Sequence, residues 1–263
     1  MTPPTLIDVF GEEGLLAARF EGYKPRPGQI QLAEACGGAI RDAVHLVAEG
    51  PTGTGKSIAY SVPAILERIP DGGRVLIVTA NIALQEQLVS KDLPLLAEML
   101  PVPFSFALMK GTSNYLCLDQ LHRSFGEDIA WARDLDDEDL QVFEEVAAWA
   151  RRTESGDKSE LDFEPAPQVW GRFSVASSEC KGADCPFAEA CHSRRARTLA
   201  RDADVIVTNY HLLFMAMKLW QLTGEDPLLP EPDVVILDEA HKAAEIARDC
   251  FGFKLGPGAL GRR

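Results

Sequence analysis

Two short stretches of the chain have the residue types of a site that hydrolyses a nucleotide. The first reads Gly50-Pro51-Thr52-Gly53-Thr54-Gly55-Lys56-Ser57 and fits the spacing G-x-x-x-x-G-K-[ST]. In such a loop, backbone N–H groups surround the phosphates, the lysine reaches the β and γ oxygens, and the serine hydroxyl binds Mg²⁺. An expected strand before the loop and an expected helix after it argue against a chance glycine-rich turn. We therefore expect a nucleotide site formed by Gly50, Thr52, Gly53, Thr54, Gly55, Lys56 and Ser57.

The second stretch, Asp238-Glu239-Ala240-His241, follows an apolar run at 234–237. Nucleotides bind at the carboxyl ends of strands in open α/β sheets, so these carboxylates would stand beside the phosphates. There Asp238 would hold Mg²⁺, and Glu239 would orient or deprotonate the attacking water. Acidic residues at a strand end are often simple helix N-caps. It is the phosphate loop that favours a catalytic role for Lys56, Asp238 and Glu239.

Four cysteines lie between these two stretches. Cys180, Cys185 and Cys191 fall within twelve residues, and Cys117 precedes them by a long segment. In a reducing compartment, clustered thiols suit a metal site better than disulfides. Four thiolates hold either Zn²⁺ or an iron-sulfur cluster, and the spacing lacks the paired C-x-x-C of many zinc sites. Residue chemistry alone leaves both open, whereas the polar surroundings argue against inert buried thiols.

The spacing of apolar residues predicts the elements that position these groups. Apolar runs alternate with amphipathic stretches, which is typical of an α/β fold with a parallel sheet. The wholly apolar run at 234–237 is typical of a strand covered on both faces. We expect helices at 57–68 and 82–90 and strands at 44–48, 75–79, 104–109, 204–208 and 234–237.

The alternation breaks between residues 116 and 170, which indicates an insertion. An acidic stretch with helical periodicity, 129–152, leads into a segment rich in Glu, Ser, Gly and Pro, 153–167, that is typical of a linker. We expect a first part of the nucleotide-binding domain at 1–110, an inserted cysteine-bearing domain at 111–200 and the remainder of the first domain at 201–263.

The composition is that of a globular protein, with 263 residues of which 46% are hydrophobic. The start of the chain lacks the basic and apolar stretches of a signal peptide. The most apolar run, 211–220, is too short to cross a bilayer. We expect a cytoplasmic protein with no membrane partner.

The net charge of −14 argues at first against a nucleic-acid partner, because phosphates attract Lys and Arg. However, residues 119–164 hold fifteen Asp and Glu against five Lys and Arg, so most of the excess lies in one segment. Beyond it, Arg194, Arg197 and Arg201 have the spacing of one helix stripe, which would suit a DNA backbone. A solvated helix face explains this stripe equally well.

Upstream of the phosphate loop, a glutamine ends the run Arg26-Pro27-Gly28-Gln29. A glutamine amide can pair with both N6 and N7 of adenine. Gln29 would thereby select ATP over GTP, and a polar turn is the alternative explanation of the same residues.

The motifs occur in a fixed order along the chain: Arg26-Pro27-Gly28-Gln29, the phosphate loop, Thr79-Ala80-Asn81, Gln85-Glu86-Gln87-Leu88, Lys110-Gly111, Tyr115-Leu116-Cys117, the three clustered cysteines, Val207-Thr208-Asn209-Tyr210 and Asp238-Glu239-Ala240-His241. In this order they resemble the first motor domain of the DinG/XPD family of superfamily 2 DNA helicases, most closely its bacterial DinG-like members. The resemblance implies a RecA-like P-loop NTPase domain that carries an inserted iron-sulfur domain. It also implies a [4Fe-4S] cluster bound by the four cysteines, which decides iron over zinc.

By the same resemblance, the protein is expected to be an ATP-dependent 5′-to-3′ DNA helicase that separates strands in repair or replication. ATP and Mg²⁺ would bind at the phosphate loop with the help of Arg26, Gln29 and His241. Thr79 and Gln85 would contact the DNA backbone, and a solvent-facing helix position is an equal alternative for Gln85. We expect single-stranded and forked DNA as partners and a monomeric protein.

The resemblance stops after the Asp-Glu-Ala-His motif. No further helicase motif follows, and no second motor domain that would supply an arginine to stabilise the transferring phosphate. We expect a fragment of a longer helicase that needs the missing second motor domain. The alternative is a truncated module that binds nucleotide or DNA and acts with a partner.

Overall fold

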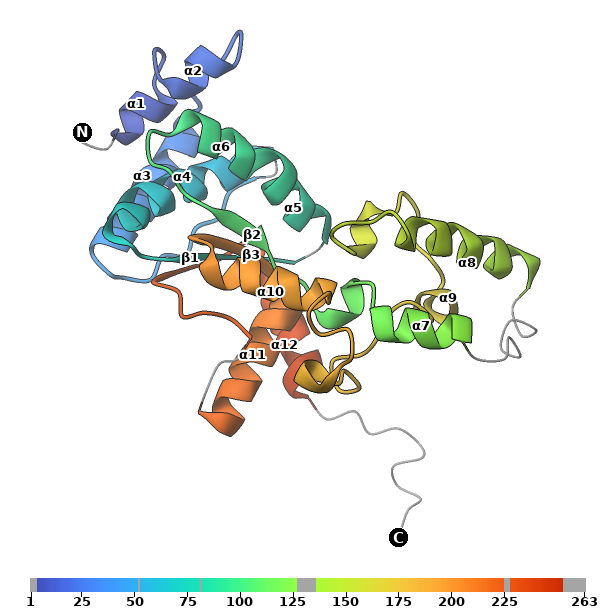
Figure 1. Cartoon of the computed structure of the whole chain (residues 1–263). Helices are drawn as coiled ribbons and strands as arrows, with labels where there is room; N and C mark the ends of the chain where they lie inside the picture. The colour runs from blue at the N-terminus through green and yellow to red at the C-terminus, as the bar shows by residue number, and fades with distance from the viewer. Residues whose placement is uncertain (1–3, 52, 81, 127–135, 225–227, 253–263) are drawn as a thin grey trace. The chain divides into compact units, whose positions relative to one another are not determined.

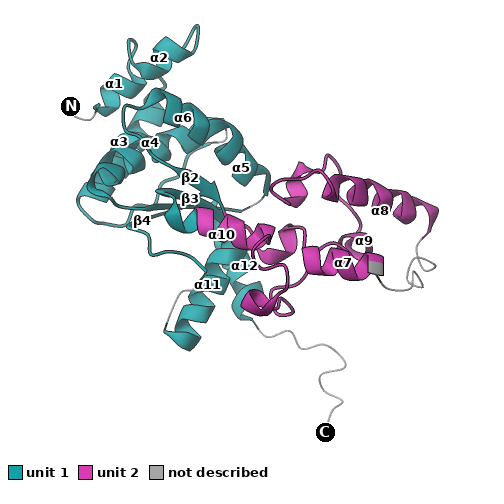
Figure 2. Cartoon of the chain, viewed as in Figure 1, with its two compact units in different colours: residues 1–108, 200–263 teal, residues 109–199 magenta. Residues whose placement is uncertain are grey.

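The computed structural model describes residues 4–51, 53–80, 82–126, 136–224 and 228–252. The chain divides into two compact units, a first unit of residues 1–108 with 200–263 and a second unit of residues 109–199 (Figure 2). The first unit contains strands β1 (Val75–Thr79), β2 (Phe106–Leu108), β3 (Val205–Asn209) and β4 (Val234–Leu237), and helices α1 (Leu6–Phe10), α2 (Leu15–Arg19), α3 (Pro27–Arg41), α4 (Lys56–Arg68), α5 (Ile82–Gln87), α6 (Leu93–Met99), α11 (Tyr210–Thr223) and α12 (Ala243–Phe251). The second unit contains α7 (Leu118–Gly126), α8 (Asp137–Ala150) and α9 (Pro167–Trp170), and α10 (His192–Asp202) crosses the boundary.

The first unit is built on a four-stranded parallel sheet in the order β2-β3-β1-β4. Strands β1, β2 and β3 are labelled in Figure 1. Side chains alternate along a strand, and the register places Val75 and Ile77 beside Val205 and Val207 on one face. All four are buried in a core shared with α3, α4 and α6. This packing holds α4, the helix that follows the phosphate loop, against the strands that end at the candidate site.

The expected helices are present with altered bounds. Helix α4 begins at Lys56 and continues through Pro63, although a proline removes one backbone hydrogen bond from a helix interior. Residues on both sides of Pro63 are buried, so packing supports the helix there. The helix expected at 82–90 is shorter, because α5 ends at Gln87 and a π-helical turn, Leu88–Asp92, leads into α6.

Two expectations about strands are wrong. Residues 44–48 form no strand, and Val47 is 99% exposed. An apolar run becomes a strand only where a neighbour accepts its backbone hydrogen bonds, and none of the described residues pairs with it. Strand β4 is the edge of the described sheet and is not covered on both faces. Val235 and Leu237 are 46% and 45% exposed, because only the face that bears the alternate residues packs on the core.

The second unit has a hydrophobic core of its own. Helix α8 packs Phe143, Val146 and Trp149 against Trp170 of α9 and Phe173. The rings of Phe143 and Phe173 lie 4.9 Å apart between centroids, and those of Trp149 and Trp170 lie 6.1 Å apart. Such aromatic pairs bury large apolar areas, so they stabilise the fold of this unit.

The acidic stretch is helical from Asp137 to Ala150, and residues 127–135 lie outside the described part of the chain. Asp136 caps this helix, since its carboxylate accepts a hydrogen bond from the N–H of Asp139 at 2.8 Å. Three acidic residues fill the first turn, where the helix dipole favours negative charge. Part of the acidic excess thus stabilises the start of α8.

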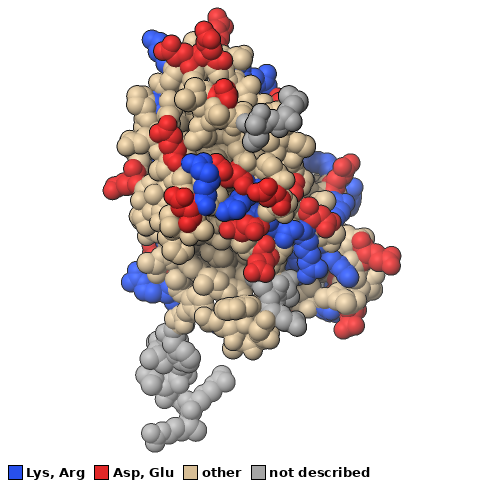
Figure 3. Space-filling model, turned by 90° about the vertical axis from the view of Figure 1, so that its left-hand side faces the viewer, with Lys and Arg blue, Asp and Glu red and all other residues tan. Residues whose placement is uncertain are grey.

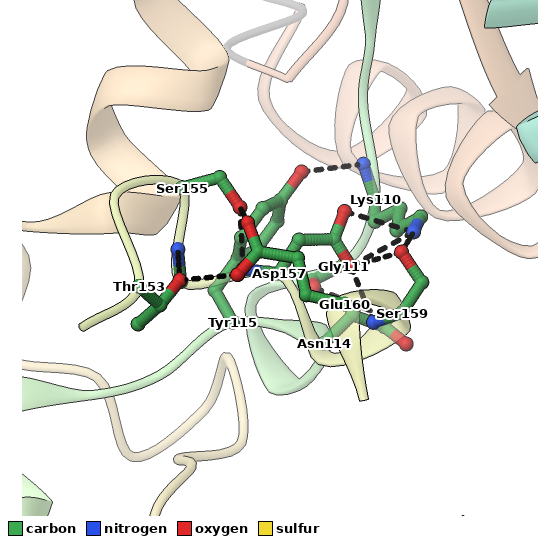
Figure 4. A network of polar contacts seen from close by, with 10 residues as sticks. Lys110, Gly111, Asn114, Tyr115, Thr153, Ser155, Asp157, Ser159 and Glu160 are labelled. Atoms are coloured by element: carbon green, nitrogen blue, oxygen red, sulfur yellow. Dashed lines mark hydrogen bonds and ion pairs between the residues drawn. The ribbon is translucent and has the colours of Figure 1, made fainter. Parts of the chain in front are cut away.

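The segment at 153–167, expected to be a linker, begins as a hydrogen-bonded loop of the second unit (Figure 4). The ammonium of Lys110, 2% exposed, lies 2.8 Å from the carboxylate of Asp157 and 2.9 Å from Oγ of Ser159. The carboxylate of Glu160 accepts hydrogen bonds from the side chains of Thr153, Ser155 and Trp149. A buried charge that lost its partner would destabilise the unit strongly, so this loop is part of the packed structure and not a linker.

Charged side chains of both signs share the surface. On the face drawn in Figure 3, Lys and Arg side chains lie among Asp and Glu side chains. The net negative charge is therefore not spread as one uniform field over this face. Within the described residues, no helix combines the length and the apolar character that crossing a bilayer requires.

Candidate nucleotide site and thiol pocket

The phosphate loop depends on two glycines for its shape. Gly53 and Gly55 have φ angles of +75° and +77°, in the left-handed region that favours glycine. Two side chains from earlier in the sequence donate hydrogen bonds to carbonyls of the loop. Arg26 donates from Nη1 to the carbonyl of Gly53, and Gln29 donates from Nε2 to the carbonyl of Gly55, each at 3.0 Å. The loop thus leads into the first turn of α4, whose free N–H groups suit a phosphate.

Gln29 packs directly against this loop and is 7% exposed. A side chain at Gly55 would overlap its amide nitrogen and lie 3.2 Å from its Cδ. The amide is engaged by the loop in this structure, and its pairing with adenine stays a prediction. Thr54 donates from Oγ1 to the carbonyl of Pro51 at 2.9 Å, and the expected ligand Thr52 lies outside the described residues.

Lys56 joins the two stretches that the sequence singled out. Its Nζ lies 3.0 Å from the carbonyl oxygen of Gly50 and 3.8 Å from Oε1 of Glu239. Ser57, the expected Mg²⁺ ligand, follows on the same helical turn and is partly buried. The loop and the acidic pair therefore lie at one place in the first unit, at the carboxyl end of β4.

Asp238 stands at the end of β4 with both carboxylate oxygens bonded. Oδ2 accepts a hydrogen bond from the hydroxyl of Tyr60 at 3.2 Å, and Oδ1 accepts one from the N–H of Glu239 at 3.0 Å. Burial raises the pKa of Asp238 above its ordinary value, and these two hydrogen bonds oppose the rise. A carboxylate in this position, beside the lysine of the loop, is the kind of ligand that Mg²⁺ takes.

Two tyrosines belong to this site, and sequence analysis gave neither of them a role there, although Tyr210 ends one of the quoted motifs. Tyr60 reaches the carboxylate of Asp238 from α4, and Tyr210 donates to its backbone carbonyl at 2.9 Å from the start of α11. Burial, with the Asp238 charge, raises the pKa of Tyr60 well above its ordinary value and that of Tyr210 to about 12. Tyr60 has a signal in the sequence, because it lies four residues after Lys56 on the same helix face. Tyr210 arrives only through the folding of β3 and α11.

Glu239 has a strained backbone. Its φ of +55° lies in the left-handed region, which is uncommon for residues other than glycine and is concentrated at functional sites. Its Oε2 lies 3.4 Å from Nδ1 of His241, whose side chain is 64% exposed. The chain therefore turns sharply after Asp238, and the turn places the Glu239 carboxylate between Lys56 and His241.

All four predicted cysteines, Cys117, Cys180, Cys185 and Cys191, line one pocket of the second unit. We call it the thiol pocket. Sγ of Cys117 accepts a hydrogen bond from the N–H of Gln120 at 3.4 Å. Burial raises the pKa of the Cys117 thiol, backbone N–H groups lower it, and the nearby Cys185 adds to the rise. Segments that are far apart in the sequence thus bring their thiols to one place.

The spacing of these thiols bears on what they hold. Within the described residues, no three Cys, His, Asp or Glu side chains stand close enough to share one metal ion. In a zinc site all four sulfurs lie about 2.3 Å from a single ion. In a four-iron cluster each thiolate binds a different iron, so the sulfurs stand farther apart. Four thiols around one pocket are the donor type that such a cluster uses, and the cluster itself stays a prediction.

An ion pair connects two of the cysteine-bearing segments. Asp119, two residues after Cys117, is 7% exposed and lies 3.0 Å from Nζ of Lys181, which directly follows Cys180. Arg123 approaches the same carboxylate at 2.5 Å. The hydrogen bond from Lys181, together with Arg123, lowers the pKa of Asp119 against the opposing effect of burial. Asp119 therefore stays charged and holds the two segments together.

The expected DNA contacts at Thr79 and Gln85 are not on the surface. Both side chains are 0% exposed, so neither reaches a DNA backbone in this structure. The alternative for Gln85, a solvent-facing helix position, is wrong, and the DNA contacts of both residues stay predictions. The amide oxygen and nitrogen of Gln85 are buried without a hydrogen-bond partner, which costs free energy that packing of α5 against the sheet must offset.

Of the three arginines predicted to form a stripe on α10, two are exposed and one is partly buried. Arg194 and Arg201 are exposed, whereas Arg197 donates from Nη2 to Oγ1 of Thr112 at 2.7 Å and has its Nε buried. The spacing of the stripe did not reveal this inward contact, because it depends on a residue 85 positions away. Contacts of these arginines with DNA stay a prediction.

The parallel sheet, the glycine loop that opens α4 and the acidic pair at the end of β4 define an α/β domain of the RecA-like P-loop type. Comparison with known proteins leads to the same class. The protein-family model described as DEAD/DEAH box helicase matches residues 27–130, and the model described as DEAD_2 matches residues 180–260.

Relatives of known name are similar over nearly the whole chain. The ATP-dependent helicase DinG of Mycobacterium tuberculosis (strain ATCC 25618 / H37Rv) is 40% identical over 91% of this chain and 38% of its own length. The ATP-dependent DNA helicase YoaA of Escherichia coli (strain K12) is 38% identical over 95% of this chain and 38% of its own length. The 3′-5′ exonuclease DinG of Bacillus subtilis (strain 168) is 29% identical over 92% of this chain and 25% of its own length. The chain is thus similar to the N-terminal part of the DinG and YoaA helicases and spans well under half of each of these relatives.

Proposed function

We propose that the first unit binds and hydrolyses ATP as the first motor domain of a 5′-to-3′ DNA helicase. The main support is the meeting of the phosphate loop with the acidic pair. Lys56 lies 3.8 Å from Glu239, and Tyr60 of the same helix lies 3.2 Å from Asp238. The names of the relatives support DNA as the partner. Strand separation in repair or replication would be the task of the longer protein.

In this proposal each side chain does what its position allows. Bound Mg²⁺ supplies positive charge that neutralises the phosphates. Ser57 and Asp238 would hold that ion, and Glu239 would orient the attacking water. Lys56 would exchange the carbonyl of Gly50 for phosphate oxygens, while Arg26 and Gln29 preserve the shape of the loop. The second motor domain would supply the arginine that stabilises the transferring phosphate.

We further propose that the thiol pocket holds a [4Fe-4S] cluster bound by Cys117, Cys180, Cys185 and Cys191. The four thiols around one pocket and the N–H directed at Cys117 support this assignment. Such a cluster would connect segments that are distant in the sequence, so it would stabilise the second unit.

Nucleotide binding tests the first proposal. The 263-residue chain is expected to bind Mg-ATP weakly, and Lys56→Ala is expected to weaken binding by about tenfold, because the lysine contacts the β and γ oxygens. Lys91→Ala, at an exposed lysine of the π-helical turn, is the matched control. Fluorescence of a labelled ATP analogue measures both. Equal affinity of the Lys56 variant and the wild type would reject the site.

Hydrolysis separates the motor from its alternative. The chain alone should hydrolyse ATP negligibly, because an arginine finger is worth about 10³ to 10⁵ in rate. Adding the second motor domain should restore turnover that depends on DNA. Robust DNA-stimulated turnover by the 263 residues alone would refute the expected need for that domain, and no gain on adding it would favour a truncated binding module.

Colour and metal content test the cluster. Protein purified without oxygen is expected to be brown, with about four iron atoms per chain. Cys180→Ser should lose the colour, whereas Cys36→Ser, at a partly buried thiol of α3, should keep it. A colourless protein with stoichiometric zinc would show that the pocket is not a cluster site.

A further inference from the structure

Gly156 occupies a special place in the hydrogen-bonded loop of the second unit. It is buried, and its φ of +67° lies in the left-handed region. Its N–H donates to Oγ1 of Thr153 at 2.9 Å, and its carbonyl accepts from the N–H of Leu116 at 2.7 Å. Leu116 directly precedes Cys117, so this hydrogen bond fixes the backbone that presents the first thiol.

The opposite side of Gly156 touches the segment that carries the last thiol. A Cβ at position 156 would lie 2.6 Å from Cδ2 and 2.7 Å from Cβ of His192, and still closer to its ring Cγ. Real Cβ atoms do not approach other heavy atoms so closely, so only a glycine leaves room for this ring. His192 directly follows Cys191 and begins α10.

We propose that Gly156 is a positioning residue of the thiol pocket, which sets the places of Cys117 and Cys191 relative to each other. This inference rests on the proposed cluster and adds a role for the segment that joins α8 to α9. The carbonyl of Gly156 accepts a hydrogen bond from the residue before Cys117. Its Cα, which carries no side chain, packs against His192, the residue after Cys191. Outer contacts of this kind orient the ligands of a metal centre.

The loop is rigid enough to act as such a support. Next to Gly156, the carboxylate of Asp157 pairs with the buried ammonium of Lys110 at 2.8 Å (Figure 4). On the other side, Ser155 and Thr153 donate to Glu160. An isolated β-bridge between Tyr115 and Asp157 connects the same loop to the segment that precedes Cys117. Displacing Gly156 would therefore move cysteine segments rather than only the loop.

Gly156→Ala tests the proposal, with Gly182→Ala as a matched control. Both glycines lie in the second unit with positive φ, at +67° and +58°, but an added Cβ at Gly182 meets nothing within 4 Å. The control thus has the same backbone strain without the contact to His192. After anaerobic reconstitution, Gly156→Ala is expected to retain iron and sulfide about tenfold less tightly towards a chelator, as for outer contacts of metal sites. Gly182→Ala should match the wild type.

A second substitution tests the mechanism. In Gly156→Ala, the further change His192→Ala removes the ring that the new methyl group meets, so it should recover most of the lost iron. His192→Ala alone should have a smaller effect than Gly156→Ala. Absence of recovery, or equal losses in Gly156→Ala and Gly182→Ala, would overturn the proposal.

Thiol reactivity gives a readout that needs no cluster. In metal-free protein, Gly156→Ala should raise the rate of maleimide labelling at Cys117 and Cys191, measured by mass spectrometry of peptides. Cys180 and Cys185 should label as in the wild type. Faster labelling of all four would indicate unfolding of the unit, and unchanged labelling would indicate that Gly156 positions neither thiol; both outcomes contradict the proposal. If the wild type holds no cluster, the proposed cofactor fails, and the labelling still decides the role of Gly156.

Discussion

Asp238, which follows β4, is oriented by side chains from two helices, α4 and α11. Tyr60 of α4 donates to its carboxylate at 3.2 Å, and Tyr210 at the start of α11 donates to its backbone carbonyl at 2.9 Å. Ligating carboxylates that are themselves hydrogen-bonded hold a metal in a defined geometry. The two hydroxyls thus prepare the expected Mg²⁺ ligand before any nucleotide arrives.

The variant Tyr60→Phe removes one of these donors without changing the ring. We expect the affinity for Mg-ATP to fall by about 1 kcal/mol, or about fivefold, since this is the net worth of one hydrogen bond. Binding of ATP in the presence of EDTA should change little, because the tyrosine acts through the ligand of the ion. Labelled-nucleotide titrations with and without Mg²⁺ measure the two affinities.

Tyr23→Phe is the control, because the hydroxyl of Tyr23 donates instead to the backbone carbonyl of Phe10, at 3.2 Å. Equal losses in both variants, or a loss that persists in EDTA, would show that Tyr60 supports the fold and not the ion.

Single residues of the site differ in how far the sequence predicts them. The phosphate loop and the clustered cysteines have short spacings that chemistry alone constrains. Tyr210 and the partner of Arg197 depend on contacts between distant segments, for which no short spacing exists. Gln85 shows the converse error, because a polar residue on an amphipathic stretch is expected outside and is buried here.

At the scale of elements, an ion pair links α7 to the segment that carries Cys180, and both contribute to the thiol pocket. Asp119 in the first turn of α7 holds Lys181, which follows Cys180, at 3.0 Å. The lowered pKa of Asp119 means that its charged form is favoured in the folded state. This ion pair therefore stabilises the folded unit above the ordinary pKa of an aspartate, about 3.9, and its contribution is lost as the pH falls through the lower folded value.

The variant Asp119→Asn makes this link testable. At pH 6 we expect it to unfold at a lower temperature than the wild type, with the difference shrinking as the pH falls below about 4. Emission of Trp149 and Trp170, both in the core of the second unit, reports the transition when Trp220 of the first unit is replaced by Phe in all variants. Asp162→Asn, at an exposed carboxylate of the same unit, should melt as the wild type does. A difference between Asp119→Asn and wild type that is independent of pH would contradict the ion-pair explanation.

Strands illustrate what an apolar run does and does not determine. The runs at β1 and β3 became strands because each has a registered neighbour. The run at 44–48 is also largely apolar but forms no strand, since hydrogen bonds to a second strand are needed and the described residues supply no partner strand. The exposed Val235 and Leu237 of β4 likewise show that an apolar run predicts a strand but not the covering of its two faces.

At the scale of the whole molecule, each unit has its own core and its own candidate site. The first core includes residues of the sheet and of helices α3, α4 and α6, and the second includes apolar residues of α8 and α9 with Leu116 and Phe173. The residues of the nucleotide site all belong to the first unit, and the four thiols all belong to the second. We therefore expect each site to act without a side chain from the other unit.

Removal of the proposed cluster therefore tests whether the two sites are independent. Chelation under reducing conditions is expected to lower the unfolding temperature of the second unit, because a bound metal centre stabilises only the folded form. The affinity of the first unit for Mg-ATP should change by less than about twofold, a free-energy difference below the net worth of one hydrogen bond. Tryptophan emission in a Trp220→Phe background follows the second unit, because Trp220 lies in α11 of the first unit, and a labelled nucleotide follows the first. A loss of nucleotide binding that accompanies loss of iron and returns on reconstitution would show that the two sites are energetically coupled, and their independence would then be wrong.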